Sequence, residues 1–169
     1  MSKPGERPAE LAALDVLVGE WVEQVILPDA PAGRAVFEWT LGGRFLLQRS
    51  ESPQPEFPDG FMIIAPDIVA GGLTQHYFDS RGVVRRYRMT LADGVWTLLR
   101  TEPDASPLDF AQRFVGTFSA DGDTIEGRWE TSDDGGAHWD LDFPLIFSAC
   151  ADPITRPVPV PPTGARRLE

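Results

Sequence analysis

The chain has very few residues of the kinds that build disulfide frameworks or metal centres. Its 169 residues include one cysteine, Cys150, and two histidines, His76 and His138. A single cysteine cannot form an internal disulfide, and these three positions lack the spacing of a zinc site. The sequence therefore predicts neither an oxidised scaffold nor a bound metal.

Basic charge and long apolar runs are also scarce. Fifteen Lys and Arg residues stand against 26 Asp and Glu, which gives a formal net charge of -11. Such a chain repels a phosphate backbone, so no nucleic-acid partner is expected. The apolar run at 61–65 is far shorter than the roughly 20 residues of a membrane-spanning helix, and residues 1–10 lack the apolar centre of a signal peptide. We expect a cytoplasmic protein that does not enter a membrane.

The length suits one domain, which begins with the only convincing helix. Leu11, Leu14 and Val18 share one apolar face, and Gly19 ends the helix. Past Cys150 the chain is dense in proline, and prolines cannot donate to a sheet. We therefore predict a flexible N-terminus (1–10), a barrel domain (11–150) and a mobile proline-rich tail (151–169).

Between helix and tail, the apolar residues follow a period of two, which is typical of strands. Ten short strands are expected, at 20–27, 34–41, 44–50, 61–65, 73–78, 83–91, 95–101, 110–118, 124–132 and 139–148. Their connections are mostly tight, glycine-containing turns, which join antiparallel neighbours. The fold class is therefore all-β: an up-and-down antiparallel barrel of about ten strands with a short N-terminal helix, with a two-sheet sandwich as the alternative.

Alternation also predicts which side chains face the interior. In the last strand one face carries Trp139, Leu141, Phe143, Leu145 and Phe147. In the strand at 83–91, Arg85 interrupts an otherwise apolar face. For 73–78 the pattern leaves two alternatives, because either Gln75 with Tyr77 or His76 with Phe78 faces inward.

A family resemblance rests on the passage from helix to first strand. The segment Gly19-Glu20-Trp21 is supported by Phe37-Glu38-Trp39 and by Gly127-Arg128-Trp129-Glu130. With the meander that follows, it resembles the calycin superfamily of lipocalin-like barrels, most of all nitrobindin-like and lipocalin-like bacterial proteins. The resemblance implies that Trp21 closes one end of the barrel and that the interior holds a small apolar molecule or haem. A nitrobindin-like haem site uses a histidine late in the chain, and none follows His138, so no cofactor is expected.

The candidate site is an apolar interior that contains a few polar groups. Arg85, Tyr87 and Gln112 are the expected polar contacts, and Trp39, Met89, Phe114 and Trp129 the expected wall. A buried arginine needs a carboxylate, which Glu38, Glu130 or an acidic ligand would supply. His76 is a weak candidate for acid–base catalysis.

The predicted function is binding of a small, mainly apolar ligand. Arg85 favours a ligand that also carries a carboxylate. Three alternatives stay open: an isomerase or cyclase that uses the cavity, a haem-binding nitrobindin-like protein, and a protein-interaction module. A homodimer is compatible with the sequence.

Overall fold

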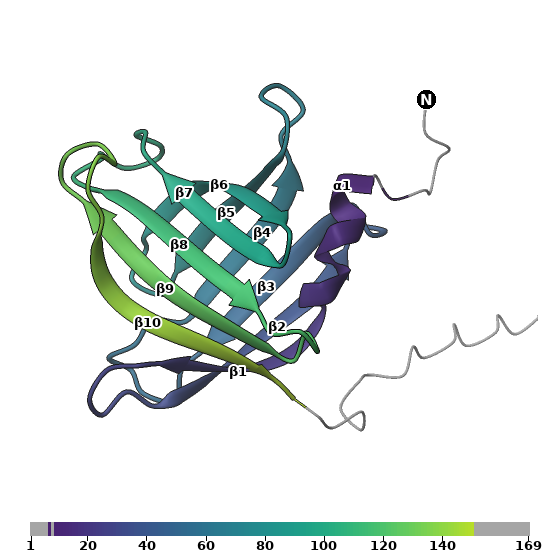
Figure 1. Ribbon diagram of the computed structural model, residues 1–169, viewed down its shortest axis with the longest axis horizontal. Helices are drawn as coiled ribbons and strands as arrows, with labels where there is room; N and C mark the ends of the chain where they lie inside the picture. The colour runs from purple at the N-terminus through teal and green to yellow at the C-terminus, as the bar shows by residue number, and fades with distance from the viewer. Residues whose placement is uncertain (1–6, 8, 151–169) are drawn as a thin grey trace, which may run out of the picture.

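Ten antiparallel strands close into one barrel (Figure 1). The computed structural model describes Arg7 and residues 9–150. The strands are β1 (Gly19–Val25), β2 (Ala32–Thr40), β3 (Phe45–Glu51), β4 (Gly60–Pro66), β5 (Leu73–Asp79), β6 (Val84–Ala92), β7 (Val95–Arg100), β8 (Ala111–Phe118), β9 (Thr124–Ser132) and β10 (Asp140–Ala149). All ten expected strands are present, and their ends differ from the expected ones by no more than two residues.

Each strand pairs with its neighbours along the chain, and β1 closes the ring by pairing with β10. Trp21 lies opposite Ala149, and Val25 lies opposite Leu145. The up-and-down barrel is thus confirmed, and the sandwich alternative is wrong, because two separate sheets would leave free edges that this ring does not have.

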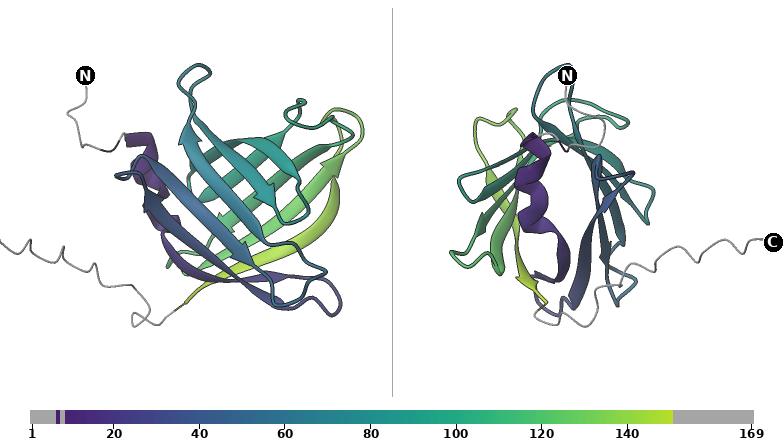
Figure 2. Two further views of the ribbon diagram at one scale, coloured as in Figure 1. Left: turned by 180° about the vertical axis from the view of Figure 1, so that it is seen from behind. Right: turned by 90° about the vertical axis from the view of Figure 1, so that its right-hand side faces the viewer.

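A short helical segment covers one end of the barrel (Figure 2, right). The α-helix α1 (Ala9–Ala12) continues into the 3-10 helix η1 (Ala13–Leu17). It begins inside the region 1–10 that the sequence assigned to a flexible N-terminus. Gly19 follows with a φ of 134°, a backbone angle that residues with a Cβ rarely adopt. Strand β1 begins at this glycine.

The buried face of this segment differs from the predicted one by one residue. Leu11, Leu14 and Leu17 are at most 1% exposed, whereas Val18 is extended and 38% exposed. A 3-10 helix has three residues per turn, so residues three apart align on one face. Leu17 therefore takes the place predicted for Val18.

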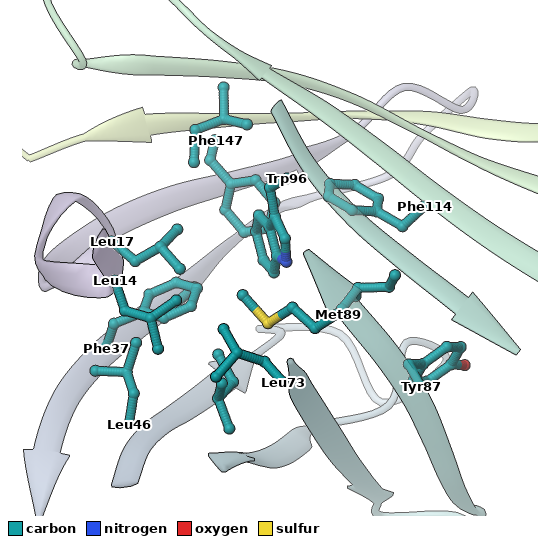
Figure 3. Close-up of a cluster of buried hydrophobic side chains, with 14 of the residues drawn as sticks. Leu14, Leu17, Phe37, Leu46, Leu73, Tyr87, Met89, Trp96, Phe114 and Phe147 are labelled. Atoms are coloured by element: carbon teal, nitrogen blue, oxygen red, sulfur yellow. The ribbon is translucent and has the colours of Figure 1, made fainter. Parts of the chain in front are cut away.

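The three leucines pack on the core of the barrel, which Figure 3 shows in close-up. Phe37 and Trp96 lie edge to face with 6.0 Å between ring centroids, and Trp96 and Phe114 do so at 4.9 Å. The Trp21 indole donates a hydrogen bond of 2.8 Å to the carbonyl of Leu17. The helix end of the barrel is therefore filled with side chains.

Two glycines make room for one ring of this core. Gly116 and Gly127 lie opposite each other across β8 and β9. A Cβ at position 127 would lie 2.5 Å from Phe114 Cε2, and a Cβ at position 116 would lie 2.9 Å from Phe114 Cζ. The Phe114 ring thus occupies the space that two side chains would fill at other cross-strand pairs.

The last strand departs from the predicted alternation. Leu141 pairs with Glu130, but Phe143 pairs with Trp129, so Asp142 is an extra residue in a β-bulge. Phe143, which lines the interior, keeps the predicted face, whereas Leu141 is 60% exposed. Trp139 also lies outside the interior row, with its ring 4.3 Å from the guanidinium carbon of Arg113.

The tail at 151–169 lies outside the described residues. Within residues 9–150, none of the helices has the length and apolar character needed to cross a membrane.

Candidate functional site

A cavity of about 500 Å³ occupies the interior at the end opposite the helix. Its walls come from inward-facing residues of the strands, and its mouth from the connections between them. Trp96, Phe114 and Phe147 lie at its inner end, and Phe57 and Phe110 at its mouth. The volume falls within the range of about 300–1,000 Å³ that is typical of small-molecule pockets.

One wall carries the three polar residues that the sequence singled out. Arg85 donates a hydrogen bond from Nη1 to the Gln112 side-chain oxygen, and the Tyr87 hydroxyl donates to the same oxygen at 3.0 Å. Phe110 lies beside the guanidinium, with 5.4 Å from its ring centroid to Cζ. These contacts join β6 to β8 and hold the Arg85 side chain at the cavity surface.

Arg85 contacts no carboxylate in the part of the chain that the structure describes. The sequence offered Glu38 and Glu130 as partners, and both are wrong. Glu38 pairs with Arg49, and Glu130 with Arg113 at 3.0 Å, on the outer surface of the barrel. The positive charge of Arg85 therefore faces the cavity with only a neutral amide oxygen as acceptor.

Tyr87 is 3% exposed, and burial is the main cause that raises its pKa to about 12. Its hydroxyl therefore keeps its proton at neutral pH and remains a hydrogen-bond donor. That proton is donated to Gln112, so on this wall the donors open to a ligand are the remaining N–H groups of Arg85.

A chain of hydrogen bonds that sequence analysis did not find runs from β5, where Gln75 lies beside Tyr87, to β3. Gln75 donates from Nε2 to Oε1 of Gln48 at 2.9 Å, and Gln48 donates from Nε2 to the Ser50 hydroxyl oxygen at 3.3 Å. Gln48 and Gln75 are 2% exposed and Ser50 is 8% exposed. Gln75 and Tyr77 face the cavity, which settles the alternative that the sequence left open for 73–78.

Glu23 of β1 lies at the end of this chain. It lines the cavity, and burial raises the pKa of its carboxyl above the ordinary value of 4.5, against the opposing effect of a hydrogen bond with Ser50. None of the ion pairs among the described residues includes it. A carboxyl group enclosed without a basic partner is destabilising in its charged form, and such groups gather at functional sites.

We expect Glu23→Gln to stabilise the folded protein at neutral pH. Because the folded state holds the Glu23 proton more tightly than the unfolded state does, wild-type stability falls as pH rises through 4.5 toward the folded pKa. The variant lacks this loss, so its Tm should exceed that of the wild type at about pH 7.5, with no difference at about pH 4. Thermal melts followed by circular dichroism measure this, with Glu126→Gln on the exposed face of β9 as the control. A lower Tm for Glu23→Gln at neutral pH would contradict the prediction.

The expected wall is placed only in part. Phe114 and Trp129 line the cavity. Met89 is 2% exposed in the filled core and does not line it. Trp39 lies at the helix end, where its indole donates to Asp15 at 2.8 Å and the Arg7 guanidinium lies 3.8 Å from its ring. The period of two identifies the inward face but not the depth along the barrel axis, which is why these two residues were misplaced.

Neither histidine faces the cavity. His76 lies on the outer surface of β5, with Nε2 3.3 Å from the Thr74 hydroxyl, beside a shallow hollow near Arg86. His138 is exposed after β9, and Nδ1 lies 2.5 Å from Asp134. Catalysis by His76 inside the barrel is therefore ruled out, and no histidine is placed to bind a haem iron there. Among the residues that the structure describes, no three His, Cys, Asp or Glu side chains gather as a metal site.

Glu23 is the residue that sequence reasoning missed, although a signal was present. Trp21, Glu23 and Val25 alternate along β1, so Glu23 shares the face of a tryptophan that was already expected at the barrel end. A charged residue between two apolar residues of one face is the same signal that identified Arg85.

The chain was also compared with known proteins. No protein-family model matches it, and no curated protein matches it at the level of sequence.

Proposed function

We propose that this protein binds a small, mainly apolar molecule that carries a carboxylate, with the carboxylate at Arg85. The observation that carries the proposal is the guanidinium of Arg85 at the cavity surface without an acidic partner. Arg85 is half-buried, so water solvates its charge only in part, and a ligand carboxylate would supply the missing anion. The calycin-like assignment is part of the same proposal and is supported by the closed barrel with its helix across one end.

The shape and chemistry of the cavity fit such a ligand. The inner end is aromatic and aliphatic, which favours an apolar body, and the polar atoms lie toward the mouth. Arg85 binds Gln112 through Nη1 alone, so its other N–H groups are open to a ligand carboxylate, whereas the Tyr87 proton is already donated to Gln112. The apolar part would thus enter first and the carboxylate would remain near the mouth.

Replacing Arg85 tests the proposal directly. We expect Arg85→Leu to weaken binding of dodecanoic acid by roughly tenfold or more, because a hydrogen bond to a charged group contributes about 1.5–3 kcal/mol. Binding of dodecanol, which lacks the charge, should change much less. Isothermal titration calorimetry measures both affinities. Arg88→Leu is the matched control, because Arg88 lies in the same strand and is exposed. The proposal would be refuted if Arg85→Leu and Arg88→Leu lost equal affinity for dodecanoic acid, or if neither compound bound the wild type.

An isomerase or cyclase is the second candidate, and Glu23 is the observation that favours it. A carboxyl group with a raised pKa in an apolar cavity is suited to moving a proton at a bound molecule. Such an enzyme would exchange the hydrogens beside the carbonyl of methyl decyl ketone in deuterium oxide. Exchange seen by nuclear magnetic resonance with the wild type and absent from Glu23→Gln would support catalysis.

A further inference from the structure

The two polar walls of the cavity face each other across the barrel. Glu23 lies in β1 and Arg85 in β6, which are five strands apart in either direction round the closed ring. Both positions lie toward the mouth, since β1 ends at Val25 and β6 begins at Val84. A ligand held by Arg85 therefore has Glu23 on the opposite side of the cavity.

The hydrogen bonds on the Glu23 side all run in one direction. Gln75 donates to Gln48, and Gln48 donates to Ser50, so the Ser50 hydroxyl is free to donate to Glu23. Glu23 is then the terminal acceptor of the chain. The acceptor positions of the carboxyl group that Ser50 does not occupy are open to a donor that enters the cavity.

The charges around Glu23 favour a positively charged donor. Besides Asp142 of β10, the described residues that the strands flanking β1 present to the cavity are apolar ones and Gly33, and none is basic. At the mouth lie Glu51, Glu56 and Asp142, together with Arg81, whose guanidinium is already held by Asp79 at 2.6 Å. The facing walls add Arg85, Tyr77 and Tyr87. Among the described residues of the cavity, Arg85 is the one base without an acidic partner, so the three acidic side chains at the rim draw cations toward the Glu23 side.

We propose that Glu23, supported by Ser50, forms a second subsite that binds a protonated amine, so that the cavity accepts apolar molecules with an amine at one end and a carboxylate at the other. The subsite extends the proposed function, because it places a second group of the same ligand. An ammonium donates up to three hydrogen bonds and supplies the counter-charge that Glu23 lacks. A neutral alcohol donates one and leaves the carboxylate charge uncompensated.

A matched set of alkyl compounds tests the subsite: dodecylamine, dodecanol, dodecanoic acid and ω-aminododecanoic acid. We expect wild-type protein to bind dodecylamine at least tenfold more tightly than dodecanol. Glu23→Gln should remove that preference, while dodecanoic acid binds the variant as tightly as the wild type or more tightly. Glu126→Gln, which removes the same charge from the outer surface, should leave the amine preference intact. Calorimetry gives the affinities.

A second measurement needs no variant. Because a bound ammonium favours the charged form of Glu23, dodecylamine binding should release protons as the pH is stepped upward from 4.5 through the raised pKa of Glu23, and dodecanol binding should not. Titrations in two buffers of different ionisation enthalpy count the released protons. The measurement remains decisive if Glu23→Gln fails to fold.

The outcomes separate this inference from the function on which it rests. If dodecanoic acid binds through Arg85 but dodecylamine binds no better than dodecanol, the amine subsite is wrong and the carboxylate site stands. Equal loss of amine binding in Glu23→Gln and Glu126→Gln also overturns the subsite, because the effect would then come from net charge alone. If none of the four compounds binds, both proposals fail.

Discussion

Replacing Arg100 with methionine should lower the free energy of unfolding by about 3–5 kcal/mol, because it leaves a buried aspartate without its counter-charge. Arg100 is 2% exposed, and its guanidinium holds Asp104 through bonds of 2.8 and 3.1 Å. The same guanidinium donates to the carbonyl of Pro107 at 3.1 Å. Asp104 also accepts the backbone N–H of Arg86 at 2.8 Å. The ion pair thus fastens the connection between β7 and β8 to the beginning of β6.

Chemical denaturation followed by tryptophan fluorescence measures the loss. Arg128→Met is the control, since the Arg128 side chain is half exposed and its partner Glu130, 3.4 Å away, keeps the ion pair with Arg113, so the loss should be about 1 kcal/mol or less. The double variant Arg100→Met with Asp104→Asn should regain part of the stability, because it removes both charges. If Arg100→Met loses no more free energy of unfolding than Arg128→Met, the ion pair of Arg100 with Asp104 contributes little to stability.

At acid pH, the free energies of unfolding of Arg100→Met and the wild type should differ less than they do at neutral pH. Arg100, with further hydrogen bonds from Arg86 and Ser106, holds the pKa of Asp104 well below the ordinary value of 3.8. A lowered folded-state pKa stabilises the protein above the unfolded value, and that contribution is lost as pH falls below 3.8. The wild type therefore loses stability over a range of pH in which the variant, without this pair, loses less.

Leu14→Ala should be the second large effect, with a loss of about 2–5 kcal/mol. Leu14 is fully buried between the helical segment and the barrel core, as Figure 3 shows, and alanine would leave a void there. Val16→Ala, on the exposed side of the same segment, should change stability by less than about 0.5 kcal/mol. Similar losses from the two variants would indicate that the segment does not close the barrel end.

The comparison of these two variants also bears on the cavity. The helical segment packs at the filled end, and the cavity lies at the other. We therefore expect Leu14→Ala to retain dodecanoic acid binding at temperatures well below its lowered Tm.

The barrel could be predicted because its signals are local. Tight turns such as Asp93-Gly94 force neighbouring strands to pair in chain order, and alternation then identifies the inward face of each strand. Arg85 was found in this way, as a charged residue on an apolar face. Glu23 carried the same signal in a shorter strand.

Other features depend on distant parts of the chain and could not be predicted from a period. The bulge at Asp142 shifts the register only because β9 holds its partners in place, so Leu141 turned out to be exposed. The depth of Met89 is likewise set by the closed ring rather than by its own strand. The extent of the cavity belongs to this group, because it depends on which side chains meet at the centre.

The paired glycines of β8 and β9 bear on which molecules the cavity admits. Because Gly116 and Gly127 have no side chains, the Phe114 ring lies across both and forms part of the inner end of the cavity. Together with Trp96 and Phe147, this ring sets how far a bound alkyl chain could reach into the barrel. Under the proposed function, Phe114 would limit the length of the bound chain. Homologues with a smaller residue at this position should then accept longer chains, without any change at the mouth.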